Sequence, residues 1–283
     1  MVIYRNYKQK NYTSQQITSI EKLVDMAIPT RSDFYDLTVN LLIECGELET
    51  GISDYYCNKK DLINQQIEVC RRISMEAGAV IFSLWSEGMF LIDRWLNIKS
   101  SLSILKQMHL PEQITVNVPE GFVFYGLYPE VYLEATSKFF GEMKPEKVLV
   151  IGLRSIGTVL SALIGAHLQS KGCVVKTLTV RPRGHPFNRF LLLDEMIRNI
   201  IKQSTGYYVI IADEGPGLSG SSIGGTLSTI KELNVPVDKT VIFPSWLPSG
   251  DRFISENARI MWNDYKKYIG SFENQWILNG RLE

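Results

Sequence analysis

Histidine and cysteine are scarce in this 283-residue sequence, with three and four residues respectively. The cysteines, Cys45, Cys57, Cys70 and Cys173, lie far apart and lack the paired spacing of metal ligands. A zinc-binding module and a disulfide framework both depend on closely patterned cysteines, so neither is indicated. We therefore expect reduced thiols and a cytoplasmic protein.

An excess of charge of either sign and a long hydrophobic run are also missing. The 30 basic residues balance the 30 acidic ones, which gives no overall attraction to nucleic acid or an anionic membrane but leaves room for a local basic patch. No apolar run has the length of a membrane-spanning helix, and the first residues lack the apolar core of a secretion signal. We expect no membrane partner.

The pattern of the sequence changes near residue 112. Before this point, apolar residues at three- and four-residue spacing predict helices over 17–26, 34–48, 62–75 and, with a break at 86–88, 77–105. After it, apolar runs alternate with helical patterns, which predicts an α/β fold with a mainly parallel sheet flanked by helices. We expect a helical region over 1–111 and an α/β domain over 112–283. The predicted strands are 114–118, 148–151, 174–180, 207–213, 240–243 and an edge strand at 259–262; the predicted helices are 129–140, 158–168, 190–201, 222–234 and 249–256.

The most informative segment runs from 207 to 222. A predicted strand ends at two acids, Asp213 and Glu214, and a loop rich in glycine and serine leads into the next helix. Backbone amides and the helix dipole bind phosphate at such a place, and the acids suit ribose hydroxyls or Mg²⁺. The segment therefore predicts a site for a phosphorylated ribose. The alternative is a plain turn whose proline and glycines only set the backbone angles.

A second unit of the same kind lies upstream. The apolar strand 148–151 is followed by the turn Gly-Leu-Arg-Ser-Ile-Gly, which ends at Gly157, and then by a helix. The turn lacks the Lys-Ser/Thr of a nucleotide-triphosphate loop. Arg154 offers a fork of donors for phosphate oxygens, although pairing with a surface carboxylate is the alternative.

Together these segments resemble the type I phosphoribosyltransferases over roughly residues 115–250. The resemblance implies that Asp213 and Glu214 bind the ribose of phosphoribosyl pyrophosphate (PRPP) and Mg²⁺. It implies that the loop residues Gly217, Ser219, Gly220, Ser221 and Ser222 hold the 5′-phosphate, and that Arg154, Ser155 and Gly157 hold pyrophosphate. The spacer 215–218 is one residue longer than in common members of this family.

A basic segment, 181–189, follows the strand 174–180. Its prolines and glycine argue against any regular element, so we expect an ordered or closing loop beside the site. In the resembled family a mobile loop in this region covers PRPP, which makes Arg181, Arg183, His185 and Arg189 candidates for phosphate contacts or for stabilising departing pyrophosphate. A solvated basic loop is the alternative. Four aromatic residues, Phe122, Phe124, Tyr125 and Tyr128, either stack on a base or pack internally.

The leading hypothesis is a Mg²⁺- and PRPP-dependent phosphoribosyltransferase or hydrolase, with Asp213, Glu214, Arg183 and His185 in the catalytic set. A non-catalytic PRPP or nucleotide sensor is the second hypothesis, and the longer spacer favours it. The third is an effector subunit of a bacterial defence or toxin system, acting on a nucleotide or nucleic acid, whose N-terminal helices dock a protein or nucleic-acid partner. A homo-oligomer is compatible with all three.

Overall fold

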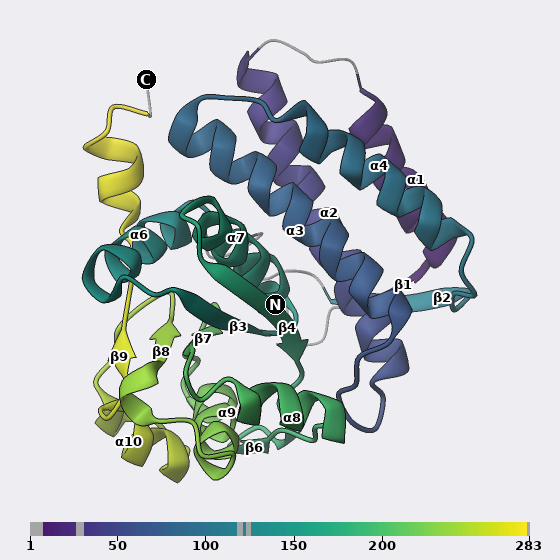
Figure 1. Cartoon of the computed structure of the whole chain (residues 1–283). Helices are drawn as coiled ribbons and strands as arrows, with labels where there is room; N and C mark the ends of the chain where they lie inside the picture. The colour runs from purple at the N-terminus through teal and green to yellow at the C-terminus, as the bar shows by residue number, and fades with distance from the viewer. Residues whose placement is uncertain (1–7, 27–30, 118–120, 123–125, 282–283) are drawn as a thin grey trace, which may run out of the picture.

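The computed structural model describes residues 8–26, 31–117, 121–122 and 126–281. Its centre is a sheet of five parallel strands in the order β4-β3-β7-β8-β9 (Figure 1). The strands are β3 (Lys147–Leu153), β4 (Val174–Val180), β7 (Tyr208–Ala212), β8 (Thr240–Phe243) and β9 (Lys266–Lys267). Strands β3, β7 and β8 have the continuous buried runs of strands covered on both faces.

Helices cover both faces of this sheet. On one face, α6 (Val131–Met143) and α7 (Ile156–Ser170) pack against strand residues such as Val150 and Ile210. On the other face, α8 (Glu195–Gln203), α9 (Ser221–Glu232) and α10 (Glu256–Trp262) pack against residues such as Ile151 and Ile211. The molecule is therefore a mixed α/β fold with a parallel sheet between helices, as the sequence predicts.

The N-terminal helices form a further layer outside α7 (Figure 1). They are α1 (Thr13–Asp25), α2 (Arg31–Tyr56), α3 (Gln65–Glu87) and α4 (Ile92–Lys106). The predicted break at 86–88 is confirmed, since α3 ends at Glu87 and Gly88 has a left-handed backbone (φ 65°). Val159 and Leu163 of α7 belong to the same apolar core as these helices, so α7 is buried on two sides.

A two-stranded antiparallel ribbon joins the start of the chain to residues after α4. It pairs β1 (Lys8–Tyr12) with β2 (Gln113–Asn117). The predicted strand at 114–118 therefore exists, but it pairs with the N-terminus rather than with the central sheet. The boundary expected near residue 112 stays a prediction, and this ribbon crosses it.

Three predictions about elements downstream are wrong. Segment 181–189 contains a short hairpin, β5 (Arg183–His185) with β6 (Asn188–Phe190), because Gly184 takes a positive φ of 91° and Pro186-Phe187 lies in the turn. Residues 259–262 belong to α10 and not to an edge strand; the edge strand is β9. Within predicted helix 249–256, the structure has a short 3₁₀ turn at Gly250–Arg252, and α10 begins only at Glu256.

Two of the aromatic residues in 122–128 pack against other parts of the protein. Phe122 packs against two of the apolar cores, and Tyr128 contacts Phe272 and Trp276 near the C-terminus. Packing is thus the observed role of these two, whereas Phe124 and Tyr125 lie outside the described residues. Across the described part of the chain, none of the helices combines the length and the apolar character that crossing a bilayer requires.

Candidate functional site

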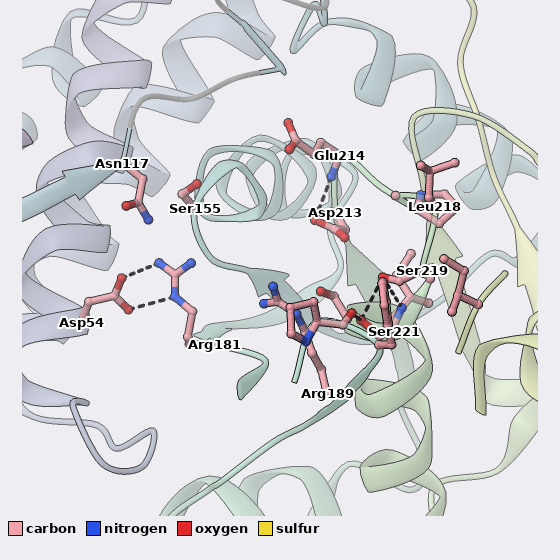
Figure 2. Close-up of a pocket in the computed structure, with 18 of the residues that line it drawn as sticks. Asp54, Asn117, Ser155, Arg181, Arg189, Asp213, Glu214, Leu218, Ser219 and Ser221 are labelled. Atoms are coloured by element: carbon pink, nitrogen blue, oxygen red, sulfur yellow. Dashed lines mark hydrogen bonds and ion pairs between the residues drawn. The ribbon is translucent and has the colours of Figure 1, made fainter. Parts of the chain in front are cut away.

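A cleft of about 910 Å³ opens at the carboxyl ends of the central strands (Figure 2). The chain runs from β3 outward to β4 and then returns to β7 on the other side of β3, so the loops after β3 and β7 diverge at this point. Such a reversal of strand order is where ligands bind in open α/β sheets, and the volume suits a small molecule. Ten of the predicted site residues line the cleft: Ser155, Arg181, Arg189, Asp213, Glu214, Gly217, Ser219, Gly220, Ser221 and Ser222.

The serine-rich loop ends at the N-terminus of α9. Gly220 occupies the cap position with a left-handed backbone (φ 64°) and has no side chain to bond the first amides of the helix. Ser219 Oγ accepts the Ser221 amide at 3.3 Å and lies 3.0 Å from Ser221 Oγ. The first amides of a helix have no partner within it, so this end can receive an anion.

The acid pair stands beside this loop at the end of β7. Asp213 Oδ1 accepts the Glu214 amide at 3.0 Å. Burial raises the pKa of Asp213 to about 6, against the opposing effects of the Glu214 and Gly215 amides and of Arg189 and Arg181. The two carboxylates point away from each other in Figure 2, so they face different parts of a bound ligand.

Neighbouring groups fix the backbone of the loop after β7. Tyr132 donates its hydroxyl to the Asp213 carbonyl at 2.7 Å, and Ser245 donates both its amide, to the Gly215 carbonyl, and its hydroxyl, to the Glu214 carbonyl. Trp246 donates its indole N–H to the Pro216 carbonyl at 2.8 Å. The Gly215–Pro216 peptide is cis. The loop is therefore held from three sides, unlike a bare surface turn.

Magnesium is the metal that the resemblance implies, and the donors present fit it. In the described part of the chain no group of three or more His, Cys, Asp or Glu side chains is positioned to hold a metal ion by itself. Mg²⁺ needs only one or two carboxylates when ligand phosphates and water complete its shell. Asp213 and Glu214 supply hard oxygen donors of this kind inside the cleft.

The loop after β3 departs from expectation at its arginine. Ser155 lines the cleft, but the Arg154 side chain is only 1% exposed and bonds Asp61, Asp54 and the Thr179 carbonyl. In this conformation Arg154 is therefore paired with carboxylates, although Asp61 is fully buried rather than the surface carboxylate of the alternative. The pyrophosphate contact of Arg154 stays a prediction. The Arg154–Ser155 peptide is cis.

Gly157 also lies outside the cleft. It is buried in the first turn of α7, where a Cβ would stand 2.6 Å from the Ala212 carbonyl oxygen. Its role is to let α7 approach the end of β7 closely. It acts on the site through packing rather than as the ligand contact that was predicted.

The basic segment 181–189 contributes two of its four candidates to the cleft. Arg181 and Arg189 line the cleft, together with Phe187 in the turn. Arg183 turns away and bonds the Cys57 carbonyl and Asp61, while His185 is exposed, accepts the Phe187 amide at 3.3 Å and contacts its ring. In this conformation neither Arg183 nor His185 lines the cleft, and their place in the catalytic set stays a prediction.

Four polar cleft residues were not predicted, and all precede residue 118. Asp54 comes from α2 and Asn117 from β2 (Figure 2). Lys8 comes from β1 and Thr115 from β2. Single polar residues in a helix and a ribbon carry no local signal of a site. Only the position of Asn117 at the end of a predicted strand could have suggested it.

Comparisons with known proteins add no assignment: neither the models of protein families nor the curated proteins contain a match to this chain.

Proposed function

We propose that the cleft binds PRPP with Mg²⁺, and that the protein is a phosphoribosyltransferase or a related hydrolase with the type I fold. The observation that supports this most strongly is a juxtaposition. An acid pair at the end of one strand and a helix N-terminus capped by glycine and flanked by serines line the same cleft. A phosphorylated ribose needs this combination, because its hydroxyls require acceptors and its phosphate requires donors.

Each group of residues has a role in this proposal. The amides of loop 219–222 and the Ser222 hydroxyl bind the 5′-phosphate, and Asp213 and Glu214 accept hydrogen bonds from the ribose hydroxyls. The Ser221 hydroxyl donates to the Pro186 carbonyl instead. Ser155 and the guanidinium groups of Arg181 and Arg189 lie where they can meet the pyrophosphate. Asp213 and Glu214 would also hold Mg²⁺, which when bound offsets the negative charge of the phosphates.

The reaction breaks the bond between ribose C1 and a pyrophosphate oxygen, whose electron pair leaves with pyrophosphate. A nitrogen of a base, or water in a hydrolase, forms the new bond to C1 and releases its proton to solvent. The protein positions the reactants and stabilises the charge that develops on pyrophosphate. The described cleft contains no group that must act as a general base.

A non-catalytic PRPP or nucleotide sensor is the second candidate, and the pairing of the arginines favours it. Arg154 and Arg183 bond Asp61, and Arg181 bonds Asp54, so three of the four arginines near the cleft are already neutralised. Paired arginines can still allow a ligand to bind at α9. They are less able to stabilise the negative charge that develops on departing pyrophosphate.

Pyrophosphate release separates the two candidates. Wild-type protein is incubated with PRPP, Mg²⁺ and a panel of purine, pyrimidine and pyridine bases, and also without a base. An enzyme releases pyrophosphate with one of the bases or with water alone, and Asp213→Asn/Glu214→Gln lowers the rate by about a hundredfold or more. PRPP binding with no release under any of these conditions would instead identify a sensor.

A further inference from the structure

Three arginines lie between the cleft and the N-terminal helices, and two aspartates hold them. Asp61 is fully buried and accepts the side chains of Arg154 and Arg183 as well as the Arg181 amide at 2.9 Å. Asp54, near the end of α2, accepts Arg154 Nε at 2.9 Å and Arg181 through both carboxylate oxygens. The aspartates thus belong to the N-terminal part of the chain and the arginines to the α/β part.

Only one of these pairs opens onto the cleft. Asp54 and Arg181 both line it, and their side chains are 28% and 21% exposed. Two parallel contacts join the carboxylate to the guanidinium group (Figure 2). Burial raises the pKa of Asp54, but Arg181 and Arg154 outweigh it and leave the pKa lowered, so Asp54 is charged at neutral pH.

A carboxylate bound in this way occupies the donors that a phosphate would use. Arginine binds carboxylate and phosphate oxygens with the same fork of N–H groups. The phosphate-binding end of α9 is built from Gly220 and its neighbouring serines and does not use Arg181. The cleft therefore has an anion position at α9 and the guanidinium group of Arg189, and a further cationic position at Arg181 that its own aspartate fills.

We propose that Asp54 is a specificity-determining residue that competes with the ligand for Arg181. The cleft then accepts a phosphate at α9 without rearrangement, whereas a pyrophosphate that binds Arg181 as well as Arg189 must displace Asp54 from Arg181. This proposal deepens the proposed function. It rests on that function because it assumes that the ligands of the cleft are phosphate esters. It gives the N-terminal region a direct part in the site, because α2 carries the competing carboxylate.

Calorimetry with inorganic phosphate, inorganic pyrophosphate and Mg²⁺-PRPP tests the proposal. Asp54→Asn keeps the shape of the side chain and removes its charge. We expect Asp54→Asn to bind pyrophosphate up to about fivefold more tightly than wild type, as the loss of one partly exposed ion pair implies, and phosphate within about twofold. Adding Arg181→Gln to Asp54→Asn should abolish the gain. The matched control is Asp25→Asn, which removes an exposed aspartate paired with Lys99 outside the cleft.

Pyrophosphate affinity that is unchanged, weaker or undetectable in Asp54→Asn would overturn the proposal. A measurement on wild-type protein keeps the test independent of the folding of the variant: the Arg181 Nε–H resonance should shift on adding pyrophosphate but not phosphate, and equal shifts would also overturn it. Failure of the proposed function has a different signature. PRPP would then bind no more tightly than pyrophosphate in every variant. This result does not depend on the ratio of the pyrophosphate affinities of Asp54→Asn and wild type.

Discussion

At the scale of single residues, Asp213 shows how the cleft is adapted to a ligand. A carboxyl group whose pKa is raised to about 6 by burial is unfavourable in its charged form, and hydrogen bonds from the Glu214 and Gly215 amides only partly offset this. Such a cost in the free protein is characteristic of binding sites, where a cation or donors supplied with the ligand relieve it.

The pKa of Asp213 gives a prediction for stability against pH. Because the folded pKa lies above the ordinary 3.8, the native state binds the extra proton, and stability falls as pH rises from about 4 through 6. Asp213→Asn should therefore be more stable than wild type at pH 8, by up to about 3 kcal/mol, and similar to it at pH 4. Urea unfolding at the two pH values measures this. An equal difference at both, or the same pattern in exposed Asp238→Asn, would contradict the account.

Two glycines that the sequence assigned to the site should behave in opposite ways. A Cβ at Gly217 meets nothing within 4 Å, whereas one at Gly157 would meet the Ala212 carbonyl oxygen at 2.6 Å. Gly157→Ala should lower the free energy of unfolding by about 1–3 kcal/mol through overpacking. Gly217→Ala should leave it nearly unchanged but weaken phosphate binding, since the methyl group enters the open cleft. Denaturant unfolding and phosphate titration of both variants check this pair.

The ion-pair partners of Arg154 could not be predicted from the sequence around it. Its type and its place after a strand favour a phosphate contact, and nothing within ten residues of it reveals a competing partner. Its partners, Asp54 and Asp61, are about a hundred positions away and belong to another region of the chain. Charge pairing over that separation depends on tertiary structure, so local sequence cannot predict it.

At the scale of elements, the strands and helices with clear apolar periodicity were predictable. Strands β4 and β8 begin and end where the sequence places them, and β7 and α9 agree to within a residue or two. The hairpin β5-β6 was missed because three-residue strands carry no periodic signal. It packs on α9 where Gly225 leaves room for the Arg189 backbone. Tertiary contact, rather than local preference, defines this element.

The contact between this hairpin and α9 yields a prediction. Ser221 donates its hydroxyl to the Pro186 carbonyl at 2.5 Å and thereby ties the hairpin turn to the phosphate loop. Ser221→Ala should raise hydrogen exchange in residues 183–190 severalfold and weaken phosphate binding. Ser222→Ala is the matched control, because it should weaken phosphate binding without changing exchange in the hairpin. Unchanged exchange in Ser221→Ala would show that the hairpin is held by other contacts.

At the scale of the whole molecule, the N-terminal helices are bound into the α/β part by a buried polar junction. Arg71 of α3 forms an ion pair with Glu49 of α2 at 3.3 Å and donates to Ser161 Oγ and the Thr158 carbonyl of α7. Helix α7 begins at the cleft, so this junction supports the site from behind. The sequence predicted helices here, but it offered no sign that they complete the cleft with Asp54 and Asn117.

Breaking the junction on one side should destabilise the entire protein. Arg71→Met leaves the Glu49 carboxylate buried without its cation and should cost about 3–5 kcal/mol in the free energy of unfolding. The double variant Arg71→Met/Glu49→Leu should recover most of this loss, because no buried charge remains. Denaturant unfolding followed by circular dichroism measures both. A double variant no more stable than Arg71→Met would show that the contacts of Arg71 with α7, and not the charge pair, hold the region.

The central claim is that the cleft recognises a phosphorylated ribose, and titration with Mg²⁺-PRPP by calorimetry tests it most directly. Wild type is compared with Asp213→Asn/Glu214→Gln and with Glu232→Gln/Asp238→Asn. The second variant removes two exposed acids away from the cleft, one at the C-terminus of α9 and one in the 3₁₀ turn at Val237–Lys239. The account predicts saturable binding by wild type and by this control, and its loss in the first double variant. Absence of binding by wild type, or binding that survives the loss of both cleft acids, would contradict it.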